Sequence, residues 1–223
     1  MGRASARSIQ DRSGPETELH RIVDEWWSGT HPSPVARLVI VAAIELFAER
    51  GFRGTTTRDI ARRVGMSTGA MYGYFGSKEE LLFEISATGH RHASDALRSA
   101  AADDAAPADQ LAAMARVFAG YHARFHTIAK IVHDDLYGMS EEHLAEVLGV
   151  RRGTEALIEN CLARGVADGA FEVANVPGVA RAVLSLCIDV ARWYQPGQGP
   201  TPEEVGHLYS DLALRMAGAC RAC

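Results

Sequence analysis

The sequence predicts an all-α protein, with about nine helices when start and stop signals are counted. Proline is absent between residues 35 and 106, and the alternating apolar and polar runs typical of strands are hard to find. Stripes of apolar residues with helical spacing instead begin at capping residues and end at glycine or proline. A chain of 223 residues that is 47% apolar can bury a substantial core.

Residues 1–33 are polar and are expected to form a flexible N-terminal extension. An apolar island within it, which can form a short helix packed on the body, consists of Ile22, Val23, Trp26 and Trp27. Three arginines offer a basic arm for DNA, although we prefer the simpler interpretation of a solvated tail; they are Arg3, Arg7 and Arg12.

The first long helix is predicted over residues 35–50. Its apolar stripe consists of Val39, Ile40, Ala43, Ile44 and Phe47. Gly51 is the residue type that commonly follows a helix end. The stripe is expected to cover the helices that follow, with Phe52 and Phe75 completing a small core.

Two short helices on a tight turn come next. Thr56 and Asp59 have the spacing of a capping pattern, so a helix is predicted to begin just after Thr56 and to stop at Gly65. Ser67 has the chemistry of a second N-cap, and the second helix is predicted over residues 68–75. This order is the helix-turn-helix pattern, whose second helix lies in the DNA major groove.

The exposed positions of the second helix carry small groups and phenols and no acid, which suits close approach to phosphates. Lys78 is placed in the first turn of the next helix, where its ammonium and the helix N-terminus would attract one phosphate. The candidate DNA-binding residues are Thr56, Thr57, Arg58, Ser67, Thr68, Gly69, Tyr72, Gly73, Tyr74 and Lys78. The alternative is a helical hairpin of an unrelated bundle, in which the two tyrosines are partly buried.

Charge is segregated along the chain. The net charge is −5, but residues 34–78 carry six arginines and one lysine against three acids, a net charge of +4. Residues 1–33 carry four arginines against five acids, and the excess of acids lies in the remainder. A basic head on an acidic body suits a protein whose head alone meets DNA.

The remaining helices are predicted from caps and breakers. One runs from Lys78 to about residue 101, and Pro107 opens the next, whose stripe ends near Tyr121. Others are predicted over residues 125–137, 140–165, 179–194 and 202–217. The last two look too apolar to be fully exposed.

Residues 36–83 closely resemble the DNA-binding domain of the tetracycline-repressor (TetR) family. The resemblance is carried by VIVAAIELFAERGF (39–52), TTTRDIA (55–61) and MSTGAMYGYFGSKEELL (66–82). Tyr72, Tyr74, Phe75 and Lys78 fall on the family's tyrosine, second aromatic, core phenylalanine and phosphate-binding lysine. Gly73 stands where the family often has a larger side chain that contacts DNA, which weakens the case for base reading at that point.

The resemblance implies three parts: the extension 1–33, a helix-turn-helix DNA-binding domain at 34–80, and a ligand-binding and dimerisation domain at 81–223. It also implies a homodimer joined through its last two helices, in place of a monomer core, that occupies a palindromic double-stranded operator. Candidates for the dimer surface are Ala182, Leu186, Val190, Leu208, Leu212 and Leu214. The expected function is a transcriptional repressor released by a small-molecule effector; the alternative is a DNA-binding protein or activator without effector control.

Residues 121–217 resemble family members that answer to acyl-coenzyme A thioesters, including regulators of fatty-acid and sterol-ring catabolism. HARFHTIAKIVHDD, GVADGAFE and ARWYQPGQGPTPEEVGHLYSDLAL carry this resemblance. A thioester needs an apolar slot with basic groups at its mouth. The candidate effector-binding residues are Phe118, Tyr121, Phe125, Ile131, Leu157, Cys161, Arg192 and Trp193. Each can instead be plain core, or a solvated side chain in the case of Arg192, and another hydrophobic ligand is the alternative.

Neither a cofactor nor a metal is predicted. His122 and His126 are four residues apart on one helical face and His133 precedes two aspartates, so spacing alone permits a metal site. Exposed histidine pairs are common on helices, however, and no dense Cys/His cluster supports one. Nucleophile-elbow, Walker and Rossmann patterns are also missing, so we do not expect an enzyme.

A cytoplasmic protein with reduced thiols is expected. The four cysteines do not have the spacing of a disulfide framework, and the C-terminal C-x-x-C pair is best interpreted as part of a frayed tail. We expect neither a signal peptide nor a membrane span, because no apolar run is long enough.

Overall fold

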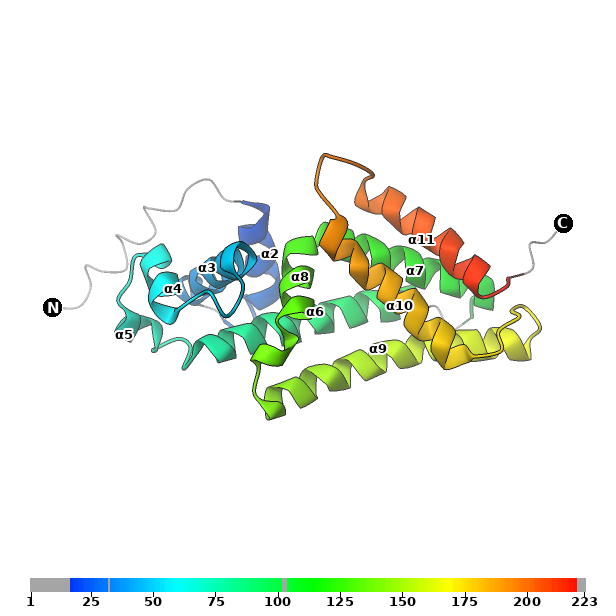
Figure 1. Ribbon diagram of the computed structural model, residues 1–223, viewed down its shortest axis with the longest axis horizontal. Helices are drawn as coiled ribbons and strands as arrows, with labels where there is room; N and C mark the ends of the chain where they lie inside the picture. The colour runs from blue at the N-terminus through cyan, green and yellow to red at the C-terminus, as the bar shows by residue number, and fades with distance from the viewer. Residues whose placement is uncertain (1–16, 32, 102–103, 220–223) are drawn as a thin grey trace. The chain divides into compact units, whose positions relative to one another are not determined.

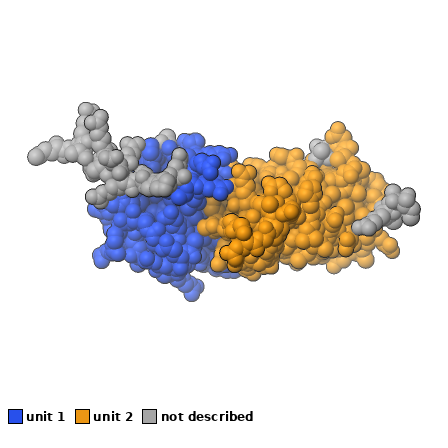
Figure 2. Space-filling model, turned by 90° about the horizontal axis from the view of Figure 1, so that it is seen from above, with its two compact units in different colours: residues 1–88, 131–141 blue, residues 89–130, 142–223 orange. Residues whose placement is uncertain are grey.

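The computed structural model describes residues 17–31, 33–101 and 104–219. Over these residues every regular element is helical, which confirms the predicted all-α fold class (Figure 1). The chain forms two compact units, coloured separately in Figure 2. Unit 1 comprises the described residues up to Thr88 together with Ile131–Glu141, and unit 2 comprises the others.

Unit 1 begins with α2 (Glu18–Trp27), which packs on α3 (Pro34–Arg50). Val23 and Trp27 of α2 are fully buried, and Asp24 forms an ion pair with Arg37 of α3. The helix anticipated at the apolar island is therefore present, but it is a fixed part of the head and not part of a flexible extension. The three arginines proposed as a basic arm lie outside the described residues.

The helix-turn-helix consists of α4 (Thr57–Val64) and α5 (Thr68–Met71). Gly65 follows α4 in the left-handed conformation, with φ +78°, which confirms the predicted stop. The prediction that the second helix extends to residue 75 is wrong, because α5 ends at Met71. The amides of Gly73 and Tyr74 bond carbonyls three residues back, and this tighter winding carries Phe75 into the core of the unit.

The long helix α6 (Lys78–Ala100) agrees with the predicted range. Its first part, with Leu81, Leu82 and Ile85 buried, belongs to unit 1, which ends along α6 at Thr88. The expected domain boundary between residues 80 and 81 therefore falls inside the part of α6 that belongs to unit 1. Unit 1 also includes the end of α8 (His126–Asp134) and the short 3-10 helix η1 (Leu136–Gly138), which together replace the single irregular helix expected over 125–137.

Unit 2 is organised around α7 (Pro107–Arg124). Helices α10 (Val176–Trp193) and α11 (Pro202–Met216) pack against it, and α9 (Glu141–Ala167) contributes Ile158 and Leu162 to the same core (Figure 1). Bounds agree with the predicted ranges to within a few residues. Helix α10 begins earlier than predicted because the Asn175 side chain accepts a hydrogen bond from the amide of Gly178 and so caps the helix before Pro177.

Glycines set the close approach of α7 and α11. A Cβ on Gly206 of α11 would lie 2.6 Å from the carbonyl oxygen of Arg116, and one on Gly120 of α7 would lie 3.2 Å from that of Pro202. Larger residues at either position would push the two helices apart. This contact fixes the shape of the surface between α7 and α11.

Candidate nucleic-acid interface and ligand groove

The N-termini of α4 and α5 are built by two side-chain caps. Thr56 accepts a hydrogen bond from the amide of Asp59, and the Asp59 carboxylate accepts one from the amide of Thr56, which completes the capping box. The hydroxyl and amide of Thr56 hold the pKa of Asp59 below its usual value. Ser67 accepts from the amide of Ala70 at 3.1 Å and caps α5. Both helices therefore begin at a side-chain cap.

The residues predicted to bind DNA gather on these two packed helices and the turn after α5. Tyr72 and Tyr74 are 51% and 40% exposed, which leaves both side chains accessible. Thr57 and Thr68 are half-buried, and the other exposed members are Thr56, Arg58, Ser67, Gly69 and Gly73. The surface is therefore small, polar and open.

Lys78 differs from the other candidates because its ammonium faces the protein. Nζ donates to the carbonyl oxygens of Phe52 at 2.6 Å and Thr55 at 2.8 Å, and it lies 4.0 Å from the centre of the Phe52 ring. Partial burial lowers the pKa of Lys78, while the nearby Asp135 carboxylate opposes that shift. An ammonium has three N–H groups, and two of those of Lys78 hold the α3–α4 turn.

The arginines of this head differ in whether an acid pairs with them. Arg63 is held by Glu45 at 2.8 Å and Glu49 at 3.0 Å, which raises its pKa and assigns it to the packing of α4 on α3. Arg53 and Arg58 are exposed, and neither has an ion-pair partner among the residues that the structure describes. Arg53 was missed at the sequence level because it lies in a turn outside the recognised caps.

Sequence reasoning also missed the contacts that the distant segment 131–141 makes within unit 1. Asp135 Oδ2 accepts a hydrogen bond from the amide of Phe52 at 3.1 Å, and Glu79 Oε1 accepts one from the amide of Ser140 at 2.8 Å. Gly138 lies so close that a Cβ there would be 2.8 Å from the Phe52 ring. Local sequence patterns carry no signal for such contacts.

The eight residues predicted to bind an effector are divided between the two units. Phe118 and Cys161 are buried in the core of unit 2, Leu157 packs against that core, and Ile131 is buried in unit 1. Arg192 and Trp193 lie on the exposed end of α10, where Arg192 pairs with Asp189 at 3.7 Å. Tyr121 and Phe125 border a pocket.

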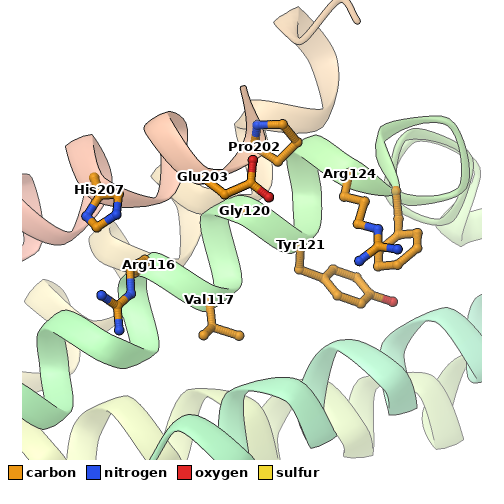
Figure 3. Close-up of a pocket in the computed structure, with 9 residues that line it drawn as sticks. Arg116, Val117, Gly120, Tyr121, Arg124, Pro202, Glu203 and His207 are labelled. Atoms are coloured by element: carbon orange, nitrogen blue, oxygen red, sulfur yellow. The ribbon is translucent and has the colours of Figure 1, made fainter. Parts of the chain in front are cut away.

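That pocket is a groove of about 460 Å³ between α7 and α11, drawn in Figure 3. The Tyr121 hydroxyl donates to the carbonyl of Gly89 at 3.1 Å, which fixes the ring, and the groove also contacts Phe125. The lining residues that sequence reasoning missed are Arg116, Val117, Gly120, Arg124, Pro202, Glu203 and His207. A weak signal existed in the four-residue spacing of Arg116, Gly120 and Arg124.

The histidines that suggested a metal site are used in other ways. His122 is buried with Nδ1 2.8 Å from the carbonyl oxygen of Phe118, and burial lowers its pKa to about 4. Nδ1 of His126 lies 3.1 Å from the carbonyl oxygen of Ala123. Across the described part of the chain, no three His, Cys, Asp or Glu side chains group in a way that could hold a metal ion. In that same part, no helix combines the length and the apolar character needed to cross a membrane.

An all-α chain with a capped helix-turn-helix in one unit and a helical second unit defines a DNA-binding transcriptional regulator, and the comparisons agree. A family model described as "Bacterial regulatory proteins, tetR family" matches residues 39–85. A second, described as "Tetracyclin repressor-like, C-terminal domain", matches residues 104–217. The chain belongs to the TetR family, and it is a regulator and not an enzyme.

Particular relatives support this assignment. The HTH-type transcriptional repressor KstR2 of Rhodococcus jostii (strain RHA1) is 30% identical over 177 residues, which cover 77% of this chain and 85% of the relative. The crystal structure of a regulatory protein in the tetR family from Rhodococcus RHA1 is 34% identical, has a TM-score of 0.81, and covers 85% of this chain and 100% of that one. AibR in complex with isovaleryl coenzyme A and operator DNA is 20% identical with a TM-score of 0.73, covering 83% and 100%, a likeness of fold alone.

Proposed function

We propose that this chain is a homodimeric repressor that occupies a palindromic operator and leaves it when an effector binds to unit 2. The observation that carries the proposal is the exposed, acid-free surface of α5 and the turn after it, set on a head of net charge +4 over residues 34–78. Because phosphate attraction depends on the local field, the net charge of −5 for the whole chain does not oppose it. The name of the relative KstR2 supports repression over activation.

On DNA, the proposed roles follow the chemistry of each side chain. Tyr72 and Tyr74 would donate their hydroxyl protons to phosphate oxygens, and Arg58 would add a charged contact. Gly69 and Thr68, on the first turn of α5, would let the backbone approach base edges closely. Since α5 has only four residues, most of the affinity would come from phosphates and little from direct base contacts.

The dimer is proposed to form through α10 and α11. Leu208 is 55% exposed on α11, and Leu186 and Trp193 are exposed large apolar residues on α10. An apolar surface on two adjacent helices suits a self-complementary interface. Val190, a sequence candidate for this interface, is fully buried in the core and is left out. A dimer would bring two heads to two half-sites. Their separation would be one helical turn of DNA, about 34–36 Å, or a multiple of it.

The effector is proposed to be an acyl-coenzyme A thioester. Support comes from the fold shared with AibR, whose structure contains isovaleryl coenzyme A. Helices α6 and α8 each contribute residues to both units, so either can carry a change in unit 2 into the head. The ligand can shift this equilibrium only if it binds the DNA-free arrangement more tightly.

The test is fluorescence anisotropy with the intergenic DNA upstream of the chain's own gene. We expect the purified protein to bind this fragment, with an affinity that falls steeply as salt rises. A panel of acyl-coenzyme A esters should then release the DNA. Failure to bind the fragment even at low salt would refute the whole proposal. Binding that no ester weakens would refute only the effector assignment and favour control by another ligand or none.

A further inference from the structure

We propose that the groove between α7 and α11 binds an organic phosphate, whose anionic groups are held by Arg116 and Arg124. Figure 3 shows these two arginines on either side of Gly120 along α7. The inference rests on the proposed function only in taking the bound molecule to be the effector. The site itself stands on the groove and its charges.

The spacing of the two arginines suits a ligand with two separated anionic groups. Arg116 and Arg124 are eight residues apart on one face of α7, so their backbone positions lie about 12 Å apart along the helix axis. Gly120 lies midway between them, where α7 and α11 approach each other closely. A planar guanidinium binds phosphate oxygens in a two-pronged geometry.

The charges of the groove are not compensated within the described residues. Neither Arg116 nor Arg124 has an ion-pair partner there, although Arg124 lies 5.3 Å from the centre of the Phe125 ring. Elsewhere in unit 2, Arg181 pairs with Glu155 at 3.3 Å and Arg91 pairs with Glu146 at 3.5 Å. The groove therefore brings together two arginines that no acid of the described chain pairs with, and Glu203 is the single acid in its lining.

The size and lining of the groove point to more than an inorganic ion. Its volume of about 460 Å³ falls in the range of sites for small organic ligands. Val117, Tyr121 and Pro202 offer apolar contact between and beside the arginines, and Tyr121 is fixed by its bond to Gly89. A molecule with phosphates and an apolar or aromatic part, such as a nucleotide or coenzyme A, matches both features.

Isothermal titration of the full chain at low salt tests the site without DNA. The probes are coenzyme A, ADP and suberate, a dicarboxylate that carries separated anions but no phosphate. We expect coenzyme A, ADP or both to bind, and suberate to bind at least tenfold more weakly. Arg116→Gln and Arg124→Gln should each weaken phosphate binding about tenfold. Arg152→Gln, an exposed arginine of α9 away from the groove, is the matched control and should change nothing.

Three results would overturn the site: no binding of either phosphate, unchanged phosphate binding by a variant that combines Arg116→Gln with Arg124→Gln, or binding of suberate as tight as that of the phosphates. Thermal unfolding of each variant confirms that the fold is intact, which is expected because both arginines are exposed. Operator binding is measured on the same preparation. If DNA binds and neither phosphate does, this inference fails and the proposed function stands. If a phosphate binds and DNA does not, the groove is a binding site and the proposed function fails.

Discussion

The carboxylate of Asp135 accepts a hydrogen bond from the main-chain amide of Phe52, with Oδ2 3.1 Å from the nitrogen, although the two residues are 83 positions apart. The carbonyl of Phe52 accepts a second bond, from Lys78. Both polar groups of one turn residue are thus held by side chains from other segments of unit 1. Since this turn leads into α4, the arrangement fixes the entry to the helix-turn-helix.

Replacing Asp135 should loosen that turn. We expect Asp135→Ala to lower the free energy of unfolding by about 1–3 kcal/mol, because the Phe52 amide loses a charged acceptor. Urea unfolding measures the change. Asp95→Ala, at an exposed position of α6, should stay within about 0.5 kcal/mol of the parent. Equal stability of the two variants would show that the Asp135 bond is not needed for the fold.

Two glycines of α9 should respond to alanine in opposite directions. A Cβ on Gly165 would lie 2.1 Å from a ring carbon of the buried Phe171, whereas one on Gly153 would meet nothing within 4 Å. Gly165→Ala should therefore destabilise by about 1–3 kcal/mol through overpacking. Gly153→Ala should stabilise by about 0.5–1 kcal/mol, because alanine costs less backbone entropy in a helix. Stabilisation by both changes, measured in urea, would contradict the packing described around Phe171.

The buried imidazole of His122 predicts a loss of stability in acid. Its pKa is lowered from 6.5 to about 4. Between these two pH values the imidazole is protonated in the unfolded chain and neutral in the folded chain. The stability that this group contributes is complete above about pH 6.5, falls by about 3 kcal/mol as the pH drops to about 4, and then levels off. His122→Phe should flatten this part of the pH profile in urea unfolding, while His207→Gln, at an exposed site, should not. An unchanged slope in the first variant would exclude His122 as the cause.

Local rules were enough for most of the head. Thr56, Gly65 and Ser67 act through bonds that reach only three or four residues, so their roles can be predicted from the sequence. The predicted end of α5 was wrong because Phe75 packs into the core. Such a tertiary contact is not part of the local rules. The sequence also indicated the short packed helix that carries the buried Trp27, because its apolar residues stand out from their polar surroundings.

The groove proposed as a ligand site was harder to predict for the same reason. Phe118 and Cys161 have the apolar character of a slot but fill the core, because the facing helices turn them inward. The groove instead joins α7 to the first turns of α11, which are distant in sequence, and only their packing through Gly120 and Gly206 creates it. Composition alone cannot tell a lining side chain from a core one.

Contacts with DNA phosphates should separate into neutral and charged kinds. Tyr72→Phe and Tyr74→Phe each remove one hydroxyl donor, so each should weaken operator binding about fivefold without changing its salt dependence. Arg58→Gln should weaken binding and also reduce the slope of log affinity against log salt by about one, because one fewer counterion is released. Anisotropy titrations at several salt concentrations measure both quantities, with Tyr137→Phe, an exposed tyrosine outside the helix-turn-helix, as the control. If Tyr72→Phe and Tyr74→Phe bind as the parent does, the turn after α5 does not face the phosphates, and the docking proposed for this surface must be abandoned.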